Sequence, residues 1–248
     1  MKRLNSLAVR HAPQIGDELL VAGLRRDLAW IHLEHGEHGL ARTQLAEALP
    51  VFRRHNDRRL QSTCLRYLAQ MAIREQDYPE AKRLLDQSMQ AAARAPESAN
   101  LLAFLDNLYG SVLLEEGDLA GAEHRYRRCL RRWRSLPQPN LFSICVVMRN
   151  LGALALRGKQ YSKAALRLRR CIQLCVEVGR EDIMGGAKLL LAQLEAEQGH
   201  AEQALVLARE AETVFTALGL HNDLDKTFEL IASLTRRGGS EPEVSTNA

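Results

Sequence analysis

Apolar residues recur along the chain at the spacing of helix faces. Leu24, Leu28 and Ile31 form one stripe, and Leu65 and Leu68 belong to another with the same three- and four-residue intervals. A short polar turn follows each stripe, and a second stripe follows the turn. The pattern predicts pairs of amphipathic helices joined by turns.

A fixed arrangement of small residues accompanies these pairs. A small residue is followed by alanine twelve positions later and by another small residue seven positions after that. The arrangement occurs five times, and the middle alanines are 40 to 42 residues apart. The five sets are Ala29, Ala41, Ala48; Ala69, Ala81, Ser88; Gly110, Ala122, Cys129; Gly152, Ala164, Cys171; and Ala192, Ala204, Ala211.

The small residues have a physical role in a helical hairpin. Two helices approach closely only where neither carries a bulky side chain, and a larger residue at such a crossing overpacks it. The spacing within each unit is constant while the spacing between units varies. This is what rigid hairpins joined by adjustable loops require.

The turns carry helix-capping signals. Gly36, Gly117, Gly158 and Gly199 lie where the first helix of a hairpin should end, and we expect them to take the left-handed conformation there. Asp77 and Asp118 precede second helices and can accept hydrogen bonds from their first amides, and Pro79 suits a first helical turn.

The small-residue register, with Tyr78 or Tyr161 three residues before the middle alanine, resembles the tetratricopeptide repeat over residues 24–220. The period is longer than the usual 34 residues. Long-period arrays of this kind resemble the repeat domains of MalT-type transcriptional activators, of other signal-transduction NTPases and of kinesin light chain. The resemblance implies an all-α fold, a right-handed α-solenoid of about five full hairpins and a half hairpin at each end, with about twelve helices.

The register also sets the expected domain limits. Ala8 and Ala232 continue it beyond both ends, which predicts one solenoid over residues 1–237, with a partial repeat at 1–22 and a closing helix at 223–237. The polar tail, 238–248, is expected to be disordered. The apolar front edge has two interpretations. Either the chain is a portion of a longer protein with further repeats or an effector domain upstream, or it is a short protein that forms a homodimer through the N-terminal edge.

Composition narrows the class of protein. The hydrophobic fraction of 46% and the charged fraction of 26% are typical of globular proteins. The sequence has no 18-residue apolar run and no secretory-signal pattern, so neither a membrane span nor export is expected. Five cysteines without framework spacing fit a reducing compartment, and we expect a cytoplasmic location.

The chain lacks the motifs of common catalytic sites. It contains no GxxxxGK[ST], GxGxxG, GxSxG, HExxH or CxxC sequence, so we expect no enzyme activity and no cofactor. His32, His35 and His38 are spaced by three, but Gly36 should end their helix, so no metal site is predicted. Cys129 and Cys171 occupy small-residue positions and are interpreted as buried structural thiols.

The resemblance implies that the first helix of each hairpin lines a concave groove. Arginine forks suit carboxylates and phosphates, so a groove rich in arginine predicts an acidic or carboxylate-bearing peptide or protein partner. The alternative is that these arginines pair with Glu34, Glu75 or Glu115 and are merely solvated. The candidate peptide-binding residues are Arg26, Trp30, Arg66, Gln70, Arg74, Phe104, Asn107, Ser111, Arg149 and Arg157.

A second basic cluster is predicted on the convex, outer helices, where Trp133 could stack on a base or pack against an inter-repeat loop. It could contact nucleic-acid phosphates. A solvated helix face is the more common meaning of such a charge run, and the formal net charge of +4 is small. The candidate nucleic-acid-binding residues are Arg127, Arg128, Arg131, Arg169 and Arg170.

These observations favour a non-catalytic scaffold that binds a protein or peptide in the groove. The resemblance to MalT-type regulators implies the sensor portion of a larger signal-transduction or transcription-regulating protein. A free-standing adaptor and a nucleic-acid-contacting module are the alternatives.

Overall fold

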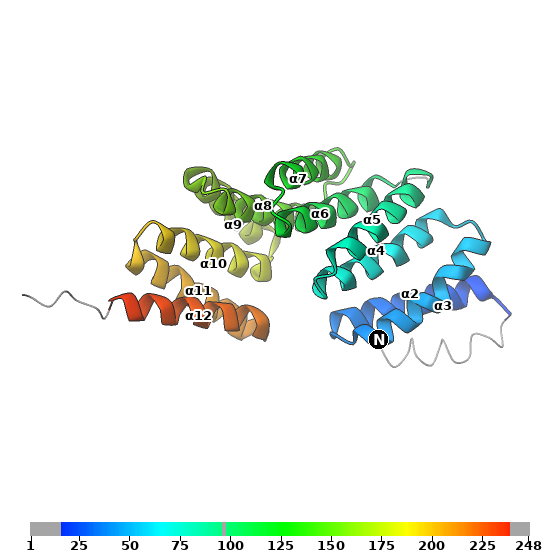
Figure 1. The fold of residues 1–248 in the computed structure, drawn as a ribbon, viewed down its shortest axis with the longest axis horizontal. Coiled ribbons are helices and arrows are strands. Elements are labelled where there is room, and N and C mark those ends of the chain that lie inside the picture. The colour runs from blue at the N-terminus through cyan, green and yellow to red at the C-terminus, as the bar shows by residue number, and fades with distance from the viewer. Residues whose placement is uncertain (1–15, 96–97, 239–248) are drawn as a thin grey trace, which may run out of the picture. The chain divides into compact units, whose positions relative to one another are not determined.

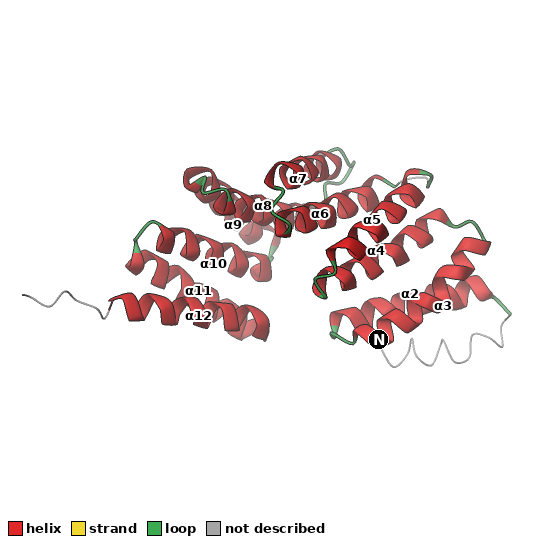
Figure 2. Cartoon of the chain, viewed as in Figure 1, coloured by secondary structure: helices red, strands yellow, loops and turns green. Residues whose placement is uncertain are grey.

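The computed structural model describes residues 16–95 and 98–238 and contains eleven α-helices and no β-strand over those ranges (Figures 1 and 2). The predicted all-α fold is confirmed. The N-terminal part of the predicted partial repeat, 1–15, and residues 239–248 of the predicted tail lie outside the described residues. The helices are α2 (Glu18–Glu34), α3 (His38–Arg54), α4 (Arg58–Arg74), α5 (Tyr78–Ala93), α6 (Ala99–Glu115), α7 (Leu119–Arg134), α8 (Leu141–Arg157), α9 (Tyr161–Val178), α10 (Glu181–Glu197), α11 (Ala201–Leu218) and α12 (His221–Gly238).

The chain divides into two compact units, Met1–Pro137 and Gln138–Ala248. The single domain expected over 1–237 stays a prediction, and each unit is described here by itself. α2 begins inside the range assigned to the partial repeat, and α12 begins two residues before the predicted closing helix.

In the first unit, three hairpins are stacked in a row: α2 with α3, α4 with α5, and α6 with α7. The first helices also touch one another, α2 against α4 and α4 against α6, whereas the described second helices of this unit do not. The first helices of successive hairpins are therefore closer together than the second helices are. Such a stack is curved, and the first helices lie on its concave side. We call the exposed sides of α2, α4 and α6 the inner surface of the first unit.

The second unit has the same organisation. α8 pairs with α9, α10 pairs with α11, and α12 packs against both α10 and α11. α8 contacts α10 and α10 contacts α12, while no contact joins α9 to α11 among the described residues. The first helices are therefore again on the inner side.

The small-residue register is the core of every hairpin. All fifteen positions of the register are buried. A Cβ atom built on Gly152 would lie 2.4 Å from Leu168, and one built on Gly110 would lie 2.7 Å from Tyr126. These two helix crossings therefore require glycine.

The residue four positions after each middle alanine is packed inside its hairpin, and in two hairpins it faces the first small residue: Tyr126 faces Gly110 and Leu168 faces Gly152. The five residues at this position have no exposed surface: Leu45, Leu85, Tyr126, Leu168 and Ala208. Glycine stands opposite Tyr126 and Leu168, while alanine suffices opposite the other three. At each helix crossing the size of the first small residue is therefore matched to the size of the residue opposite it.

The left-handed residue of each turn lies five positions before the middle alanine. Gly36, Gly117 and Gly199 take positive φ there, as predicted. The prediction for Gly158 is wrong: its φ is −79°, and Lys159 is left-handed instead, with φ of 52°. Gly158 lies six positions before the middle alanine, one residue earlier than the left-handed residue of the other turns. The geometry of the hairpin fixes which position is left-handed, and that position is not always occupied by glycine.

The predicted caps are present. The carboxylate of Asp77 accepts a hydrogen bond from the amide of Glu80 at 3.1 Å, and that of Asp118 accepts one from Gly121 at 2.9 Å. Pro79 stands at the start of α5. These local signals place the turns that hold the hairpins in register.

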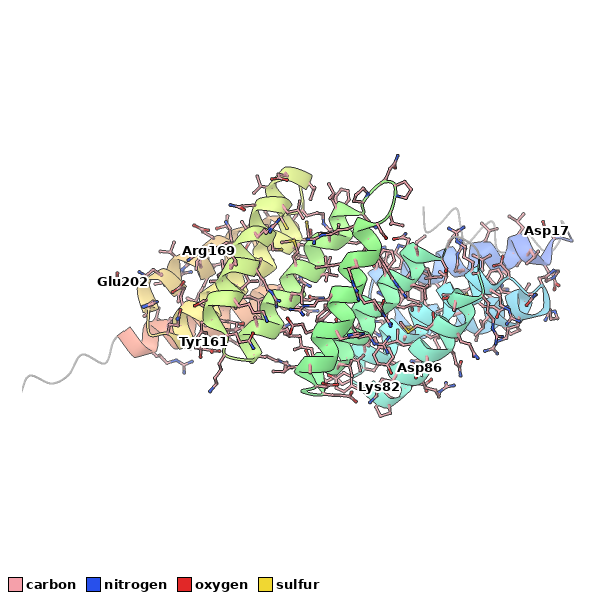
Figure 3. All side chains as sticks on the ribbon, turned by 90° about the horizontal axis from the view of Figure 1, so that it is seen from above. Asp17, Lys82, Asp86, Tyr161, Arg169 and Glu202 are labelled. Atoms are coloured by element: carbon pink, nitrogen blue, oxygen red, sulfur yellow. The ribbon has the colours of Figure 1, made fainter. Side chains whose placement is uncertain are left out.

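Ion pairs join successive hairpins of the first unit at equivalent positions. Arg42 of α3 lies 2.9 Å from Glu75 after α4, and Lys82 of α5 lies 2.6 Å from Glu116 after α6. Lys82 is labelled in Figure 3. Among the described helices, none is long and apolar enough to span a bilayer.

Candidate functional site

Aromatic and arginine side chains from α2, α4 and α6 meet on the inner surface of the first unit. Trp30 of α2 stacks on Tyr67 of α4 with ring centroids 5.3 Å apart, and Trp30 remains 38% exposed. The guanidinium of Arg66 lies 4.4 Å from the Tyr67 ring and 5.4 Å from the Phe104 ring of α6. The structure thus brings three predicted residues together and adds Tyr67, which the sequence reasoning missed.

Arg66 is the most unusual charge of this cluster. Its Nη1 donates to Oε1 of Gln70 at 3.2 Å, but its buried Nε has no hydrogen-bond partner. Burial lowers the pKa of Arg66 from its ordinary value. No carboxylate of the described residues pairs with it, so a desolvated guanidinium is held by two aromatic faces and one neutral amide. We call Trp30, Arg66, Tyr67, Gln70 and Phe104 the Arg66 cluster.

Other predicted residues of the inner surface have partners within the fold. Arg26 pairs with Asp27 at 2.6 Å, and Nη1 of Arg74 donates to the carbonyl oxygen of Leu33 at 3.0 Å. The bond from Arg74 joins α4 to the end of α2. Arg26 is therefore paired within its own helix, and Arg74 helps to hold α4 against α2.

Ser111 and Asn107 belong to a hydrogen-bond chain. The Tyr126 hydroxyl donates to Oγ of Ser111 at 3.1 Å, and Ser111 donates to the carbonyl oxygen of Asn107 at 3.2 Å. Trp133, considered above for base stacking, is 1% exposed. Its indole Nε1 donates to Oδ1 of Asn100 at 2.8 Å and its ring meets Phe104 edge-on, so that suggestion is wrong.

The predicted arginines of the second unit have different surroundings. Nη1 of Arg149 lies 3.1 Å from where a Cβ of Gly186 would be, so this side chain crosses α10 at a glycine. Arg157 is exposed at the end of α8. Leu189, at the register position of Arg149 one hairpin later, is buried.

A buried carboxylate organises the basic helix α7. Asp106 of α6 has no exposed surface and meets three guanidiniums of α7. Nε of Arg128 lies 2.9 Å from both carboxylate oxygens, Arg125 lies at 3.3 Å and Arg132 at 3.1 Å. The hydrogen bonds to Asp106 raise the pKa of Arg128. Arg128, predicted on the convex face, is thus turned toward α6.

The remaining predicted outer arginines project from the helices. Arg127 pairs with Glu123 at 3.2 Å and stays largely exposed. Arg131 of α7 and Arg169 and Arg170 of α9 are exposed, and Figure 3 labels Arg169. α7 and α9 belong to different units, so the basic face of each helix is described by itself.

The five cysteines are buried and free. Burial raises the pKa of Cys64, Cys145 and Cys175 to about 12 and that of Cys171 to about 11. The pKa of Cys129 is raised for the same reason. Protonated thiols are poor nucleophiles and metal ligands. Over the described residues no group of histidine, cysteine and acidic side chains could hold a metal ion.

Comparison with known proteins agrees with the sequence register. A family model described as tetratricopeptide repeat matches residues 101–175. No curated protein sequence matches the chain.

Several solved structures have a similar fold. BtubC from P. vanneervenii has a TM-score of 0.68 at 16% identity, over 88% of this chain and 91% of that one. A Rap protein in complex with competence and sporulation factor has a TM-score of 0.65 at 15% identity, over 95% and 71%. A signal transduction ATPase with numerous domains and a tetratricopeptide repeat sensor, from Pyrococcus horikoshii, has a TM-score of 0.69 at 13% identity, over 94% of this chain and 37% of that one. At these identities the likeness shows the fold alone.

Proposed function

We propose that this chain, whose residues 101–175 match a tetratricopeptide repeat model, is a non-catalytic recognition module whose Arg66 cluster binds an acidic or carboxylate-bearing peptide. The observation that carries the proposal is the desolvated Arg66 guanidinium without an acid partner among the described residues. A ligand carboxylate supplies the acid partner that the guanidinium lacks among the described residues. Hydrogen bonds to charged groups contribute roughly 1.5–3 kcal/mol.

The competing interpretation was that the inner arginines pair with nearby glutamates. Glu75, one of those glutamates, pairs instead with Arg42 at 2.9 Å. Arg26 and Arg74 do have partners within the fold, which leaves Arg66 as the arginine of this surface best suited to an external acid.

Trp30 and Phe104 add apolar contact on either side of the charge. Trp30 is held by its stack on Tyr67 and is still 38% exposed, as expected of an aromatic anchor at an interface. The cluster is built on three packed helices, so a flexible peptide alone bears the ordering cost. The favoured ligand has a carboxylate next to an apolar side chain.

We further propose a sensor role within a larger regulatory protein in the cytoplasm. The resemblance to MalT-type arrays supports it, as does the likeness in fold to a signal transduction ATPase that has a tetratricopeptide repeat sensor. A free-standing adaptor is the alternative. The genomic reading frame upstream of this chain distinguishes the two. A domain of ATPase or DNA-binding type encoded in the same reading frame supports the sensor role, and an independent transcript for this chain supports the adaptor role.

Nucleic-acid contact through the outer helices is the less favoured function. Arg131, Arg169 and Arg170 are exposed, but Arg128 is held by Asp106. Retention of DNA that falls steeply between 50 mM and 200 mM salt, as expected for phosphate contacts, favours this alternative.

The proposal is tested with two fluorescein-labelled peptide pools of equal length, one rich in Glu and Asp with interspersed Leu and Phe, the other with Gln and Asn in place of the acids. Fluorescence anisotropy should show tighter binding of the acidic pool. The Arg66→Gln variant should weaken it at least ~10-fold, about 1.4 kcal/mol. The matched control is Arg59→Gln, an exposed arginine on the same helix. Equal binding of both pools, or equal losses in both variants, contradicts the proposal.

A further inference from the structure

A cavity of about 310 Å³ lies within the first unit, where α3 ends, α4 begins and α5 ends. It does not include the Arg66 cluster. Three arginines line the cavity, one at the end of α3, one at the start of α4 and one directly after α5. The other polar residues of the lining are glutamines, and the lining contains no carboxylate. The lining residues are Arg53, Arg58, Gln61, Leu65, Gln87, Gln90, Ala91 and Arg94.

The repeat register explains why space exists at this point. Leu65, Gln87 and Ala91 stand 41 residues before Asp106, Arg128 and Arg132 of the next hairpin. In α6 and α7 those three residues meet as an ion cluster around the buried carboxylate. In α4 and α5 shorter or neutral side chains hold the same positions. The cavity therefore occupies the place of the ion cluster and lacks its acid.

The charges around the cavity are uncompensated within the described part of the chain. Arg58 is partly buried at the first turn of α4, while Arg53 and Arg94 are exposed at the ends of α3 and α5. None of the three forms an ion pair with a described residue. The neighbouring Arg54, in contrast, pairs with Glu18 at 2.6 Å.

We infer that this cavity binds a phosphate monoester dianion, with Arg53, Arg58 and Arg94 around the phosphoryl oxygens and Gln87 and Gln90 at the rim. Guanidinium forks match phosphate geometry, and a dianion of charge near −2 balances three arginines better than a single carboxylate does. The α4 N-terminus is capped within the fold, where Oδ1 of Asp57 accepts a hydrogen bond from the amide of Leu60 at 2.9 Å, so the arginines supply the positive charge of the site. Both a free small phosphate and a phosphorylated side chain present this group.

The experiment titrates the full chain by calorimetry at fixed 150 mM chloride with three probes: inorganic phosphate, a phosphoserine peptide and the same peptide without phosphate. Saturable binding of inorganic phosphate supports the site with a free phosphate as sufficient ligand. Binding of the phosphoserine peptide alone supports it with a phosphorylated side chain as the source. Binding of neither, or equal binding of both peptides, overturns it.

Two variants locate the site. Arg58→Gln combined with Arg94→Gln should weaken phosphate binding at least ~10-fold, while the matched control Arg59→Gln, outside the cavity, should leave it within ~2-fold. Gln87→Glu places an acid among the arginines, as in the α6–α7 hairpin, and should abolish binding while raising Tm. Full affinity in Gln87→Glu, or equal losses in Arg59→Gln and the double variant, overturns the inference. Since neither Arg66 nor Trp30 takes part, failure here leaves the peptide proposal intact.

Discussion

The inner helices of the two units place an arginine at the same register position in different environments. Arg66 in the first unit lies against two aromatic rings, and its buried Nε has no partner. Arg149 in the second unit crosses Gly186. It also helps to lower the pKa of Asp182, although hydrogen bonds from Arg180 are the larger cause. The comparison shows that the repeat register fixes where on the helix the arginine stands. The residues of the neighbouring helix determine whether its guanidinium has a polar partner.

The largest expected effect comes from removing the buried carboxylate of Asp106, which has no buried counterpart among the described residues of the second unit. Asp106→Asn leaves Arg125, Arg128 and Arg132 without their buried carboxylate and should cost about 3 kcal/mol of unfolding free energy. Urea denaturation followed by circular dichroism measures it.

The control in the second unit is Lys188→Met, which removes the ion pair with Glu210 at 2.9 Å. That pair is partly exposed, so its loss should cost less than about 1 kcal/mol. Similar costs for both variants would show that burial of Asp106 does not distinguish the two hairpins.

The second effect concerns the glycine crossing of the α8–α9 hairpin. Gly152→Ala forces Leu168 aside and should cost roughly 1–3 kcal/mol. Adding Leu168→Ala reproduces the pair Ala192 and Ala208 of the next hairpin and should recover part of the loss to Gly152→Ala. Chemical denaturation of the four members of this double-mutant cycle measures the coupling, and strict additivity would contradict the matched-pair interpretation.

The third effect sharpens the comparison of the two arginines. Arg66→Gln should weaken acidic-peptide binding at least ~10-fold, whereas Arg149→Gln should change it less than ~3-fold, because Arg149 lies near Asp182 and outside the Arg66 cluster. Anisotropy titrations of both variants at one salt concentration test it. Equal losses would place the binding surface on both units.

The smallest effect compares two turns that lack glycine at the left-handed position. Gln76, with φ of 60°, and Lys159, with φ of 52°, are strained there. Replacing either with glycine should raise the unfolding free energy by up to about 1 kcal/mol. Thermal denaturation checks this, with Gly117→Ala as the opposite change. A decrease in Tm for Lys159→Gly would show that its side chain has a stabilising contact.

Much of the hairpin architecture was predictable because it repeats. The positions from Ala29 to Ala211 recur with constant internal spacing, and every one of them is buried. The left-handed residue before α9 was assigned wrongly because glycine was given more weight than register. Tyr67 was missed because it is adjacent to Arg66 in sequence, and a stack on Trp30, 37 residues earlier in the chain, leaves no local signal.

The sequence by itself determined the helices, their pairing and the residues that make close crossings, since these depend on contacts a few residues apart that recur in each repeat. Tertiary structure decided which arginines have partners. Arg128 was turned inward by Asp106, and Arg66 was left between aromatic rings. The cavity among Arg53, Arg58 and Arg94 also came from tertiary structure. The physical reason is that the free energy of a charge depends on what surrounds it in space, and those neighbours come from other helices.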